Sequence, residues 1–298
     1  MRLTASVRSV LRISALLKAP PKATAGAGAQ QTAAIKERMA GIKHTLLVMS
    51  GKGGVGKSTL STTLARALAQ SRKVAVLDID ICGPSQPRMM GVEDESVVSD
   101  ATGWQLVPIA PNLSVMSIGF LLNKTDNTAV VWRGPRKHGM IRQFLKDVAW
   151  GTPDYLVIDT PPGTSDEHIS IAESLASTGG VDGAILVTTP QEVALMDVRK
   201  EISFCATTKL PVVGVVENMS SFVCPCCNEQ SVIFPATTGG AQAMCRDAEL
   251  DLLARIPFDP RLAKCTDEGL DFLSLHSDSP TAVAYKQLAD LVVQLCEK

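Results

Sequence analysis

The chain has 298 residues, of which 45% are hydrophobic and 4% aromatic, and its formal net charge at pH 7 is −1. That charge gives no whole-chain electrostatic attraction for nucleic acid, and no apolar run approaches the ~20 residues that a membrane-spanning helix needs. Eight cysteines are too few for a disulfide scaffold in a chain of this length. We therefore expect a globular protein from a reducing compartment, with no nucleic-acid partner and no membrane span.

The first 40 residues differ in composition from the rest of the chain. Six basic residues precede the first acidic residue, Glu37, and the apolar residues among them lie mostly at helical spacing. A basic, amphipathic segment without acids is typical of a mitochondrial transit peptide, and the alternative is a disordered basic tail on a cytosolic protein. We expect residues 1–40 to form a leader and residues 41–298 a single domain. The expected location is the mitochondrial matrix, with the cytoplasm as the alternative.

From Thr45 onward, apolar runs that read as strands alternate with helical stretches, and glycine and proline stand at the joints. This alternation predicts the α/β class, with a doubly wound and mostly parallel sheet. Strands are expected at 46–49, 74–79, 113–118, 155–158, 184–187 and 212–216, and helices at 59–69, 140–148, 167–174, 197–207 and 280–296.

The run Gly51–Ser58 fits the pattern G-x-x-x-x-G-K-[ST] of a phosphate-binding loop, and it lies between an expected strand and an expected helix. In such a loop, backbone N–H groups point at phosphate oxygens. Lys57 would then reach the β- and γ-phosphates, and the Ser58 hydroxyl would hold Mg²⁺. The nucleotide-binding residues expected here are Gly51, Gly53, Gly54, Val55, Gly56, Lys57, Ser58 and Thr59.

Carboxylates follow two of the expected strands, at the edge where ligands gather in open α/β sheets. Asp78 and Asp80 close one strand, and their alternation places both on the same side. Asp159 closes another strand and looks like the Walker B carboxylate, which holds Mg²⁺ through water. Gly163 follows it, in a run that resembles the switch that senses the γ-phosphate. An aspartate at a strand end can instead cap the next helix.

A pair of cysteines, Cys224 and Cys227, stands in a C-x-x-C motif, with Cys226 between them. The pair can grip one metal centre, but a tetrahedral metal site or a four-iron cluster needs four ligands. Cys245 or Cys265 could complete a site within one chain, although neither has a paired spacing. Two-fold symmetry is the more economical solution, with two thiolates from each subunit. By itself the motif is equally compatible with zinc, a redox dithiol or no ligand.

A second lysine, Lys52, stands next to the first glycine of the phosphate loop, and the pattern K-G-G-x-G-K-[ST] resembles the deviant Walker A group of ATPases. In that group the extra lysine points across a dimer interface to the partner's nucleotide. The resemblance therefore implies a dimeric ATP hydrolase in which Lys52 and Lys57 stabilise the transferring phosphate and Asp80 positions the attacking water. The alternative for Lys52 is a solvated surface lysine.

Several motifs in one order resemble the Mrp-type nucleotide-binding proteins, whose members carry or assemble iron–sulfur clusters. The resemblance implies a slowly hydrolysing ATPase that binds ATP, Mg²⁺ and a labile [4Fe–4S] cluster held by Cys224 and Cys227. It also implies a homodimer or a heterodimer with a paralogue, with apo iron–sulfur proteins as clients. Asn218, Pro257 and Asp259 fall where the family contacts adenine. The motifs are Gly51–Ser58, Leu77–Ser85, Val131–Pro135, Asp159–Asp166, Thr189–Val193 and Asn218–Ser220 with Cys224–Cys227.

The motifs and the leader favour different subtypes of this family. Gly163–His168 and Thr238–Cys245 look closest to the larger subunit of the cytosolic scaffold, but no cysteine precedes Cys82 to form that subunit's N-terminal cluster. The leader instead suits the mitochondrial relatives. Two other functions stay open: a positioning ATPase of the partition or division-site type, and an ATPase whose cysteines hold a structural zinc ion.

Overall fold

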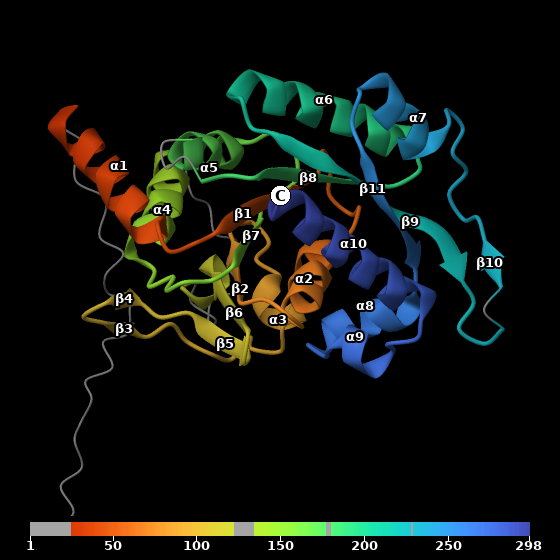
Figure 1. The fold of residues 1–298 in the computed structure, drawn as a ribbon, viewed down its shortest axis with the longest axis horizontal. Helices are drawn as coiled ribbons and strands as arrows, with labels where there is room; N and C mark the ends of the chain where they lie inside the picture. The colour runs from red at the N-terminus through yellow and green to blue at the C-terminus, as the bar shows by residue number, and fades with distance from the viewer. Residues whose placement is uncertain (1–24, 122–133, 177–179, 228) are drawn as a thin grey trace, which may run out of the picture.

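A single twisted sheet organises the fold in the computed structural model, which describes residues 25–121, 134–176, 180–227 and 229–298 (Figure 1). The strand order is β10-β9-β8-β1-β7-β2-β6-β5, and β11 also pairs with β9. The pairings are parallel except that β5 and β10 run antiparallel to their neighbours. The strands of this sheet are β1 His44–Met49, β2 Val74–Asp78, β5 Val107–Ala110, β6 Leu113–Ser117, β7 Tyr155–Asp159, β8 Gly183–Thr188, β9 Val212–Val223, β10 Gln230–Ser231 and β11 Leu252–Phe258.

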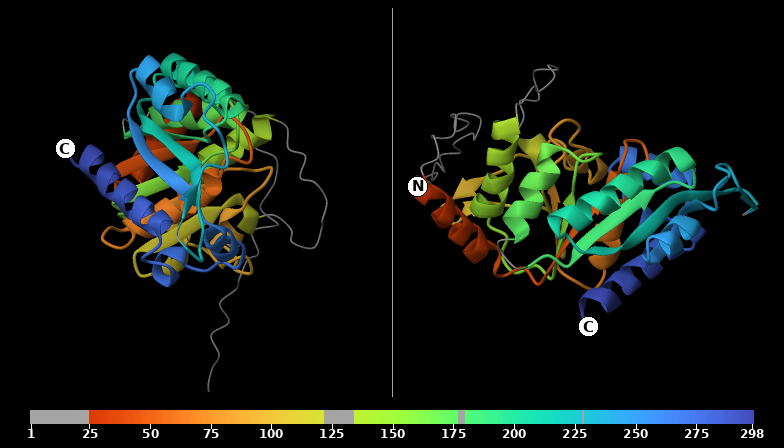
Figure 2. Two further views of the ribbon diagram at one scale, coloured as in Figure 1. Left: turned by 90° about the vertical axis from the view of Figure 1, so that its right-hand side faces the viewer. Right: turned by 90° about the horizontal axis from the view of Figure 1, so that it is seen from above.

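Helices cover both faces of the sheet, which confirms the expected doubly wound α/β class (Figures 1 and 2). One layer holds α2, α3, α8, α9 and α10, and the other holds α4, α5, α6 and α7. No helix in the described segments is long and apolar enough to cross a bilayer. The helices are α1 Ala25–Met39, α2 Lys57–Leu68, α3 Gln86–Met89, α4 Gly134–Asp147, α5 Asp166–Ala176, α6 Glu192–Thr208, α7 Gly240–Asp247, α8 Pro260–Asp267, α9 Phe272–Leu275 and α10 Pro280–Cys296.

The core consists of aliphatic side chains from the central parallel strands. β1, β2, β7 and β8 are buried almost throughout, because helices cover both of their faces. This burial explains why these strands read as continuous apolar runs in the sequence. The chain leaves β1 for β2 on one side, whereas β8 lies on the other side of β1. The carboxyl end of β1 is therefore a point where the strand order reverses, and ligands bind at such points.

Several strands differ from the sequence expectation. β9 continues seven residues beyond the expected end at Val216, and its last part pairs with the short strand β10 to form a hairpin. This β9–β10 hairpin projects from one end of the molecule (Figure 1, right). β5 and β11 were not expected, because their exposure alternates irregularly and gives no continuous apolar run. A separate ribbon pairs β3 (Ser99–Asp100) with β4 (Gly103–Trp104).

Helix α1 corrects the expected boundary of the leader at residue 40. The helix begins at Ala25, and its Ile35 and Met39 side chains are buried in the hydrophobic core. Arg38 also donates a hydrogen bond from Nε to the carbonyl of Lys146, at the end of α4. Residues 25–39 therefore contribute to the folded domain, because their apolar side chains at i and i+4 face helix α4.

We predict that Ile35→Ala lowers the free energy of unfolding by about 2–4 kcal/mol, because it leaves a cavity where α1 packs on the domain. The matched control is Lys36→Ala, whose side chain is exposed and whose effect should stay within about 0.5 kcal/mol. Denaturant unfolding followed by circular dichroism measures both. Equal transition midpoints for the two variants would show that α1 does not stabilise the domain.

Candidate functional site

The phosphate loop connects the carboxyl end of β1 to the start of α2, as the sequence predicts. The N–H groups of residues 51–59 donate to no acceptor in the described part of the chain. Helix α2 also has no capping side chain and no acidic residue in its first turn. A row of free N–H donors at a helix N-terminus is a site for an anion.

Glycines give this loop its shape. A Cβ atom at Gly53 or Gly54 would meet nothing within 4 Å, so the backbone there borders open space that side chains would otherwise occupy. Gly56 has φ of 84°, and a Cβ on it would lie 2.2 Å from Nδ2 of Asn218. Glycine is required at position 56 both for its left-handed backbone and for this close approach.

A buried ion pair lies beneath the loop. Lys57 Nζ is 2.5 Å from Oδ1 of Asp159, and both side chains are almost fully buried. The Asp159 carboxylate also accepts hydrogen bonds from Ser61 Oγ at 3.0 Å and from Gln86 Nε2 at 2.8 Å. Gln86 in turn accepts from the Thr62 hydroxyl at 2.7 Å. These contacts fix the Asp159 carboxylate at the floor of the site.

Asp78 lies beside Asp159 on the neighbouring strand, where the two residues are in register. Its carboxylate accepts from the Ser117 hydroxyl at 2.9 Å and from the Asp80 N–H at 3.1 Å. Burial, and then the adjacent Asp159 carboxylate, raises the pKa of Asp78. Asp78 therefore orders the strand end, whereas Asp159 faces Lys57.

These residues fit Mg²⁺ with a nucleoside triphosphate. The free N–H groups can take phosphate oxygens, and Lys57 and Ser58 lie side by side, with Nζ 3.2 Å from Oγ. For Lys57 to reach phosphate and for Asp159 to face Mg²⁺, their ion pair must open. Nucleotide would thus replace one charge pairing with two, because the ammonium gains phosphate and the carboxylate gains the metal ion.

Two of the expected catalytic residues, Asp80 and Lys52, do not take part in the ion pair beneath the loop. Asp80 folds back on its own chain, and Oδ1 accepts the N–H groups of Cys82 at 3.3 Å and Gly83 at 3.2 Å. Burial raises the pKa of Asp80, and nearby Lys57 opposes this increase. Lys52 is half-buried, and its ammonium makes no ion pair with a described residue.

Gly163 differs from its expected role. Its N–H donates to the carbonyl of Ser50 at 2.7 Å, so it does not point freely toward a phosphate. Its φ of 80° is a left-handed conformation that glycine adopts without strain. This bond closes the switch run on the phosphate loop, and it must break before the same N–H can contact a γ-phosphate.

The three residues expected at the adenine divide into two groups. Asn218 Nδ2 donates to the carbonyl of Val55 at 2.9 Å, and Pro257 lies on the strand next to Asn218. Asp259 instead caps α8, and both of its carboxylate oxygens bind Arg261. Met219, directly after Asn218, has a left-handed φ of 54° inside β9, which bends the strand there.

The cysteine pair lies at the tip of the β9–β10 hairpin. Cys224 is half-buried, Cys227 is exposed, and the Cys224 N–H donates to the carbonyl of Glu229 at 3.0 Å. The N–H of Cys227, followed by that of Cys226, lowers the pKa of the Cys224 thiol. Among the described residues no third metal ligand joins the pair. Cys245 and Cys265 are buried in α7 and α8, so neither completes the site within one chain.

Histidine 168 spans the switch run from its inner side. Its Nδ1 accepts from the Ser165 N–H at 3.2 Å, and Nε2 lies 3.1 Å from the Thr160 hydroxyl oxygen. The Thr160 hydroxyl donates to the carbonyl of Val48 at 2.9 Å, so the neutral ring carries its proton on Nε2 and donates to Thr160. Burial lowers the pKa of His168 to about 4.

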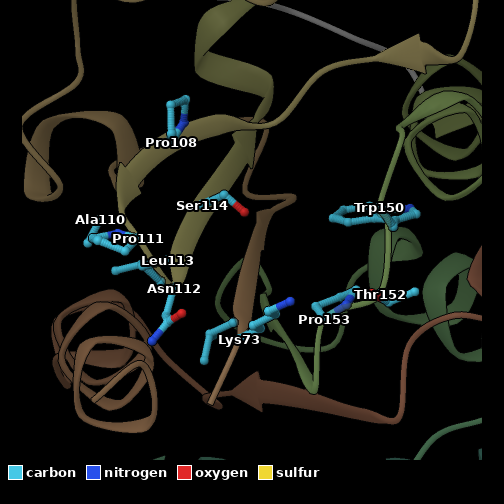
Figure 3. A pocket seen from close by; sticks show the side chains of 11 residues that line it. Lys73, Pro108, Ala110, Pro111, Asn112, Leu113, Ser114, Trp150, Thr152 and Pro153 are labelled. Carbon is cyan, nitrogen blue, oxygen red and sulfur yellow. The ribbon is translucent and has the colours of Figure 1, made fainter. Parts of the chain in front are cut away.

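Gln86, Ser61 and His168 were not expected to support the site. Ser61 follows the loop by one helical turn, so its spacing from Lys57 is a signal that sequence reasoning could use. Gln86 belongs to no spacing pattern with its partners, whereas His168 accepts from the Ser165 N–H three residues earlier, which is the spacing of a capping box at the start of α5. One cavity of about 270 Å³ lies where β2 and β6 begin, and none of the expected site residues lines it (Figure 3).

We predict that His168→Gln weakens the acid sensitivity of the fold. An unfolded histidine titrates near pH 6.5, so between about pH 6.5 and 4 the unfolded chain binds a proton that native His168 excludes. The free energy of unfolding therefore falls as pH drops through this window, by about 1–2 kcal/mol more in the parent than in the variant between pH 7 and 4.5. Urea unfolding at several pH values measures this difference. Asp78 titrates in both proteins and cancels, so identical pH slopes would contradict the prediction.

Comparison with known proteins supports the nucleotide loop and the cysteine motif together. The sequence model of the ParA-type NUBPL iron-transfer P-loop NTPases matches residues 41–293. The cytosolic Fe-S cluster assembly factor NUBP1 homolog of Caenorhabditis elegans is 60% identical over 260 residues, covering 87% of this chain and 83% of that protein. Its counterpart in Brugia malayi is 56% identical over 261 residues, covering 87% and 84%.

Solved structures share the fold. The nucleotide-binding protein of Archaeoglobus fulgidus, in complex with ADP and with Co, has a TM-score of 0.70 and 37% identity, covering 85% of this chain and 95% of that chain. The cell division ATPase MinD of Pyrococcus furiosus has a TM-score of 0.60 and 24% identity, covering 85% and 99%. At that identity the second likeness concerns the fold alone.

The names of the curated relatives overturn the expected location in the mitochondrial matrix, because each relative is named as a cytosolic factor. The basic composition of residues 1–40 was therefore a misleading signal for a targeting sequence. The family match runs from just before β1 almost to the end of α10, so it includes both the phosphate loop and the cysteine pair. The chain belongs to the NUBPL iron-transfer P-loop NTPase family.

Proposed function

We propose that this protein is a cytosolic ATPase that assembles iron–sulfur clusters and passes them to apoproteins. Two subunits would hold one [4Fe–4S] cluster between them, through Cys224 and Cys227 of each. The proposal rests on the position of the two thiols at a projecting hairpin, where Cys224 is half-buried, Cys227 is exposed and a single chain offers two of the four ligands that a cluster needs. The partner would be a second copy or a paralogue.

One strand connects the nucleotide loop to the cysteines. Asn218 contacts the loop through the Val55 carbonyl, and Cys224 follows six residues later, directly after the strand ends at Val223. At ~3.3 Å per residue, the two ends of this segment lie roughly 20 Å apart. A shift of the loop on nucleotide binding would therefore reach the base of the hairpin through the Asn218 hydrogen bond and the backbone of β9.

The loop residues supply the binding of the nucleotide. Mg²⁺ neutralises charge on the phosphates when it is bound. The N–H groups of the loop orient the phosphates, Lys57 adds positive charge, and Asp159 faces the metal ion. Asp80 would position water after leaving its own turn, and Lys52 would act on the nucleotide of the other subunit. We expect hydrolysis to be slow. Lys57, Asp159 and Asp80 must first leave their present partners, and Lys52 acts only when a second subunit has bound.

The fold also suits a positioning ATPase, since cell division ATPases such as MinD share it. That function predicts ATP turnover without uptake of iron. A structural zinc site at the same thiols predicts bound zinc without sulfide. Both alternatives are outcomes of the experiment below.

We predict that anaerobic reconstitution with iron and sulfide gives a brown protein that contains about four irons per dimer. Cys224→Ser or Cys227→Ser should abolish the visible absorbance, because each removes two of the four ligands from a symmetric dimer. Cys226→Ser is the matched control, since Cys226 is exposed in the same turn and should retain the cluster. Uptake of zinc alone, or iron uptake that persists without Cys224 and Cys227, would contradict the proposal.

We predict that Lys52→Ala lowers the ATP turnover rate at least about ten-fold while nucleotide affinity changes less than about three-fold, because an extra cation acts on the transition state in a two-subunit site. The control is Lys264→Ala, a lysine with 73% exposure on α8. Steady-state hydrolysis and equilibrium binding of a fluorescent ATP analogue measure the two quantities. Unchanged turnover would remove the role of a second subunit in hydrolysis.

A further inference from the structure

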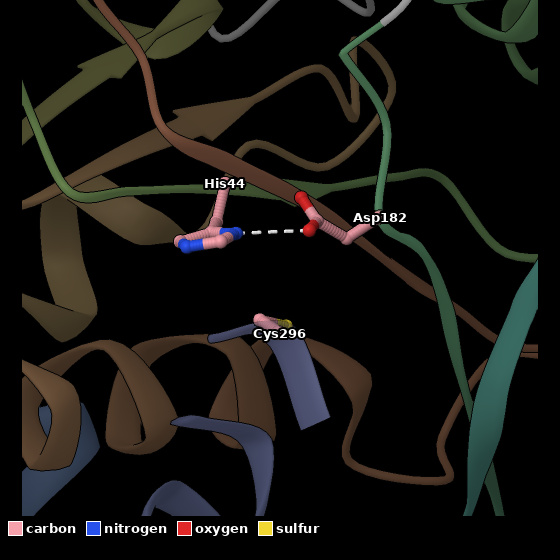
Figure 4. Close-up of side chains that lie close together, drawn as sticks. All are labelled: His44, Asp182 and Cys296. Carbon is pink, nitrogen blue, oxygen red and sulfur yellow. Dashed lines mark hydrogen bonds and ion pairs between the residues drawn. The ribbon is translucent and has the colours of Figure 1, made fainter. Parts of the chain in front are cut away.

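Three potential metal ligands gather at the end of the sheet opposite the phosphate loop (Figure 4). His44 is the first residue of β1, Asp182 precedes β8, and Cys296 is the last residue of α10. One ligand atom from each lies within 4.8 Å of the other two. The three residues come from distant parts of the sequence, so the fold alone brings them together.

The imidazole and the carboxylate are held in fixed orientations. Asp182 accepts a hydrogen bond from the Thr45 N–H at 2.7 Å through one oxygen, and its other oxygen lies 2.9 Å from His44 Nδ1. The His44 ring stacks on Tyr155, with ring centroids 5.0 Å apart. Supporting contacts of this kind orient the ligands of protein metal sites.

The thiol is held in place by the end of helix α10. Glu297, next to Cys296, binds the Arg72 guanidinium through both carboxylate oxygens at 2.9 Å. Tyr155 also donates its hydroxyl to Glu297 at 3.1 Å, so the residue that stacks on His44 also anchors the helix end. One network therefore supports all three candidate ligands.

We propose that His44, Asp182 and Cys296 bind a divalent transition-metal ion, for which Zn²⁺ is the best match. Imidazole, carboxylate and thiolate are the three ligand types of protein zinc sites, whereas Mg²⁺ and Ca²⁺ prefer oxygen alone. Zinc–ligand bonds of about 2.0–2.3 Å place tetrahedral ligand atoms roughly 3.3–3.8 Å apart. The three ligand atoms, which lie within 4.8 Å of one another, would need only small shifts to reach these separations, and water would complete the coordination.

The local charge also favours a cation. The Asp182 carboxylate places negative charge beside the His44 ring, and a bound metal ion would displace the thiol proton of Cys296. All three ligands are partly exposed, so an ion can enter from solvent.

This site shares no residue with the nucleotide loop or the cysteine hairpin. β1 separates it from the phosphate loop by the length of the strand, roughly 17–20 Å. Its occupancy is therefore independent of the proposed function, and either proposal can fail without the other. A metal ion here would cross-link β1, the start of β8 and the C-terminal helix.

The test uses the full chain with Cys224→Ser, Cys226→Ser and Cys227→Ser, so that the hairpin thiols cannot bind metal. Zn²⁺ affinity is measured by competition with a chromogenic chelator, and Co²⁺ serves as the spectroscopic probe. We expect one metal ion per chain and, with Co²⁺, a thiolate-to-cobalt charge-transfer band with intense visible bands of tetrahedral geometry. No bound metal, or bound Co²⁺ without the charge-transfer band, would overturn the proposal.

Variants then assign the ligands. Cys296→Ser should abolish the charge-transfer band, and Cys296→Ser or His44→Gln should weaken Zn²⁺ binding at least about ten-fold. The matched control is Cys265→Ser, a buried thiol outside the cluster, which should leave affinity and spectrum unchanged. Unchanged Zn²⁺ affinity in Cys296→Ser would overturn the proposal. If that variant does not fold, the Co²⁺ spectrum of the parent decides the question.

Discussion

The buried ion pair between Lys57 and Asp159 is the interaction on which the site depends. Lys57 Nζ lies 2.5 Å from Oδ1 of Asp159, and both side chains are almost fully buried. A bound triphosphate and its metal ion would each pair with one of these two groups and so separate them. Breaking such a pair without replacement partners costs several kcal/mol, so it stabilises the loop in the conformation described here. The hydrogen bonds of Gln86 and Ser61 to Asp159, and the bond from the Gly163 N–H to the Ser50 carbonyl, stabilise the same conformation.

The fold connects this pair to two distant surfaces through strands rather than through loops. β9 leads from the Asn218 contact toward the cysteine pair, and β1 leads from the loop back to His44. β1 pairs with β7 and β8 on its two sides, whereas the pairing of β9 with β11 shifts its register between Asn218 and Phe222. The β9–β10 hairpin thus holds the candidate metal ligands, whereas the buried central strands fix the position of the phosphate loop.

The sequence predicted the central strands, the phosphate loop and the carboxylates beside it, because these features depend on local patterns: apolar runs, glycine spacing and strand ends. It failed where distant residues decide the outcome. The boundary of the leader was wrong because Ile35 and Met39 find partners on α4. Gln86 contacts Asp159 across 73 positions, which no spacing rule indicates.

Met219 introduces backbone strain into the long strand β9. A left-handed conformation costs a side-chain-bearing residue roughly 1 kcal/mol or more, and here it occurs between the nucleotide contact and the thiols. The Asn218–Val55 hydrogen bond before this residue and the pairing of β9 with β10 after it hold the backbone in that conformation. The segment between these two contacts is therefore the part of β9 whose backbone would relax most readily if the Asn218 contact were lost.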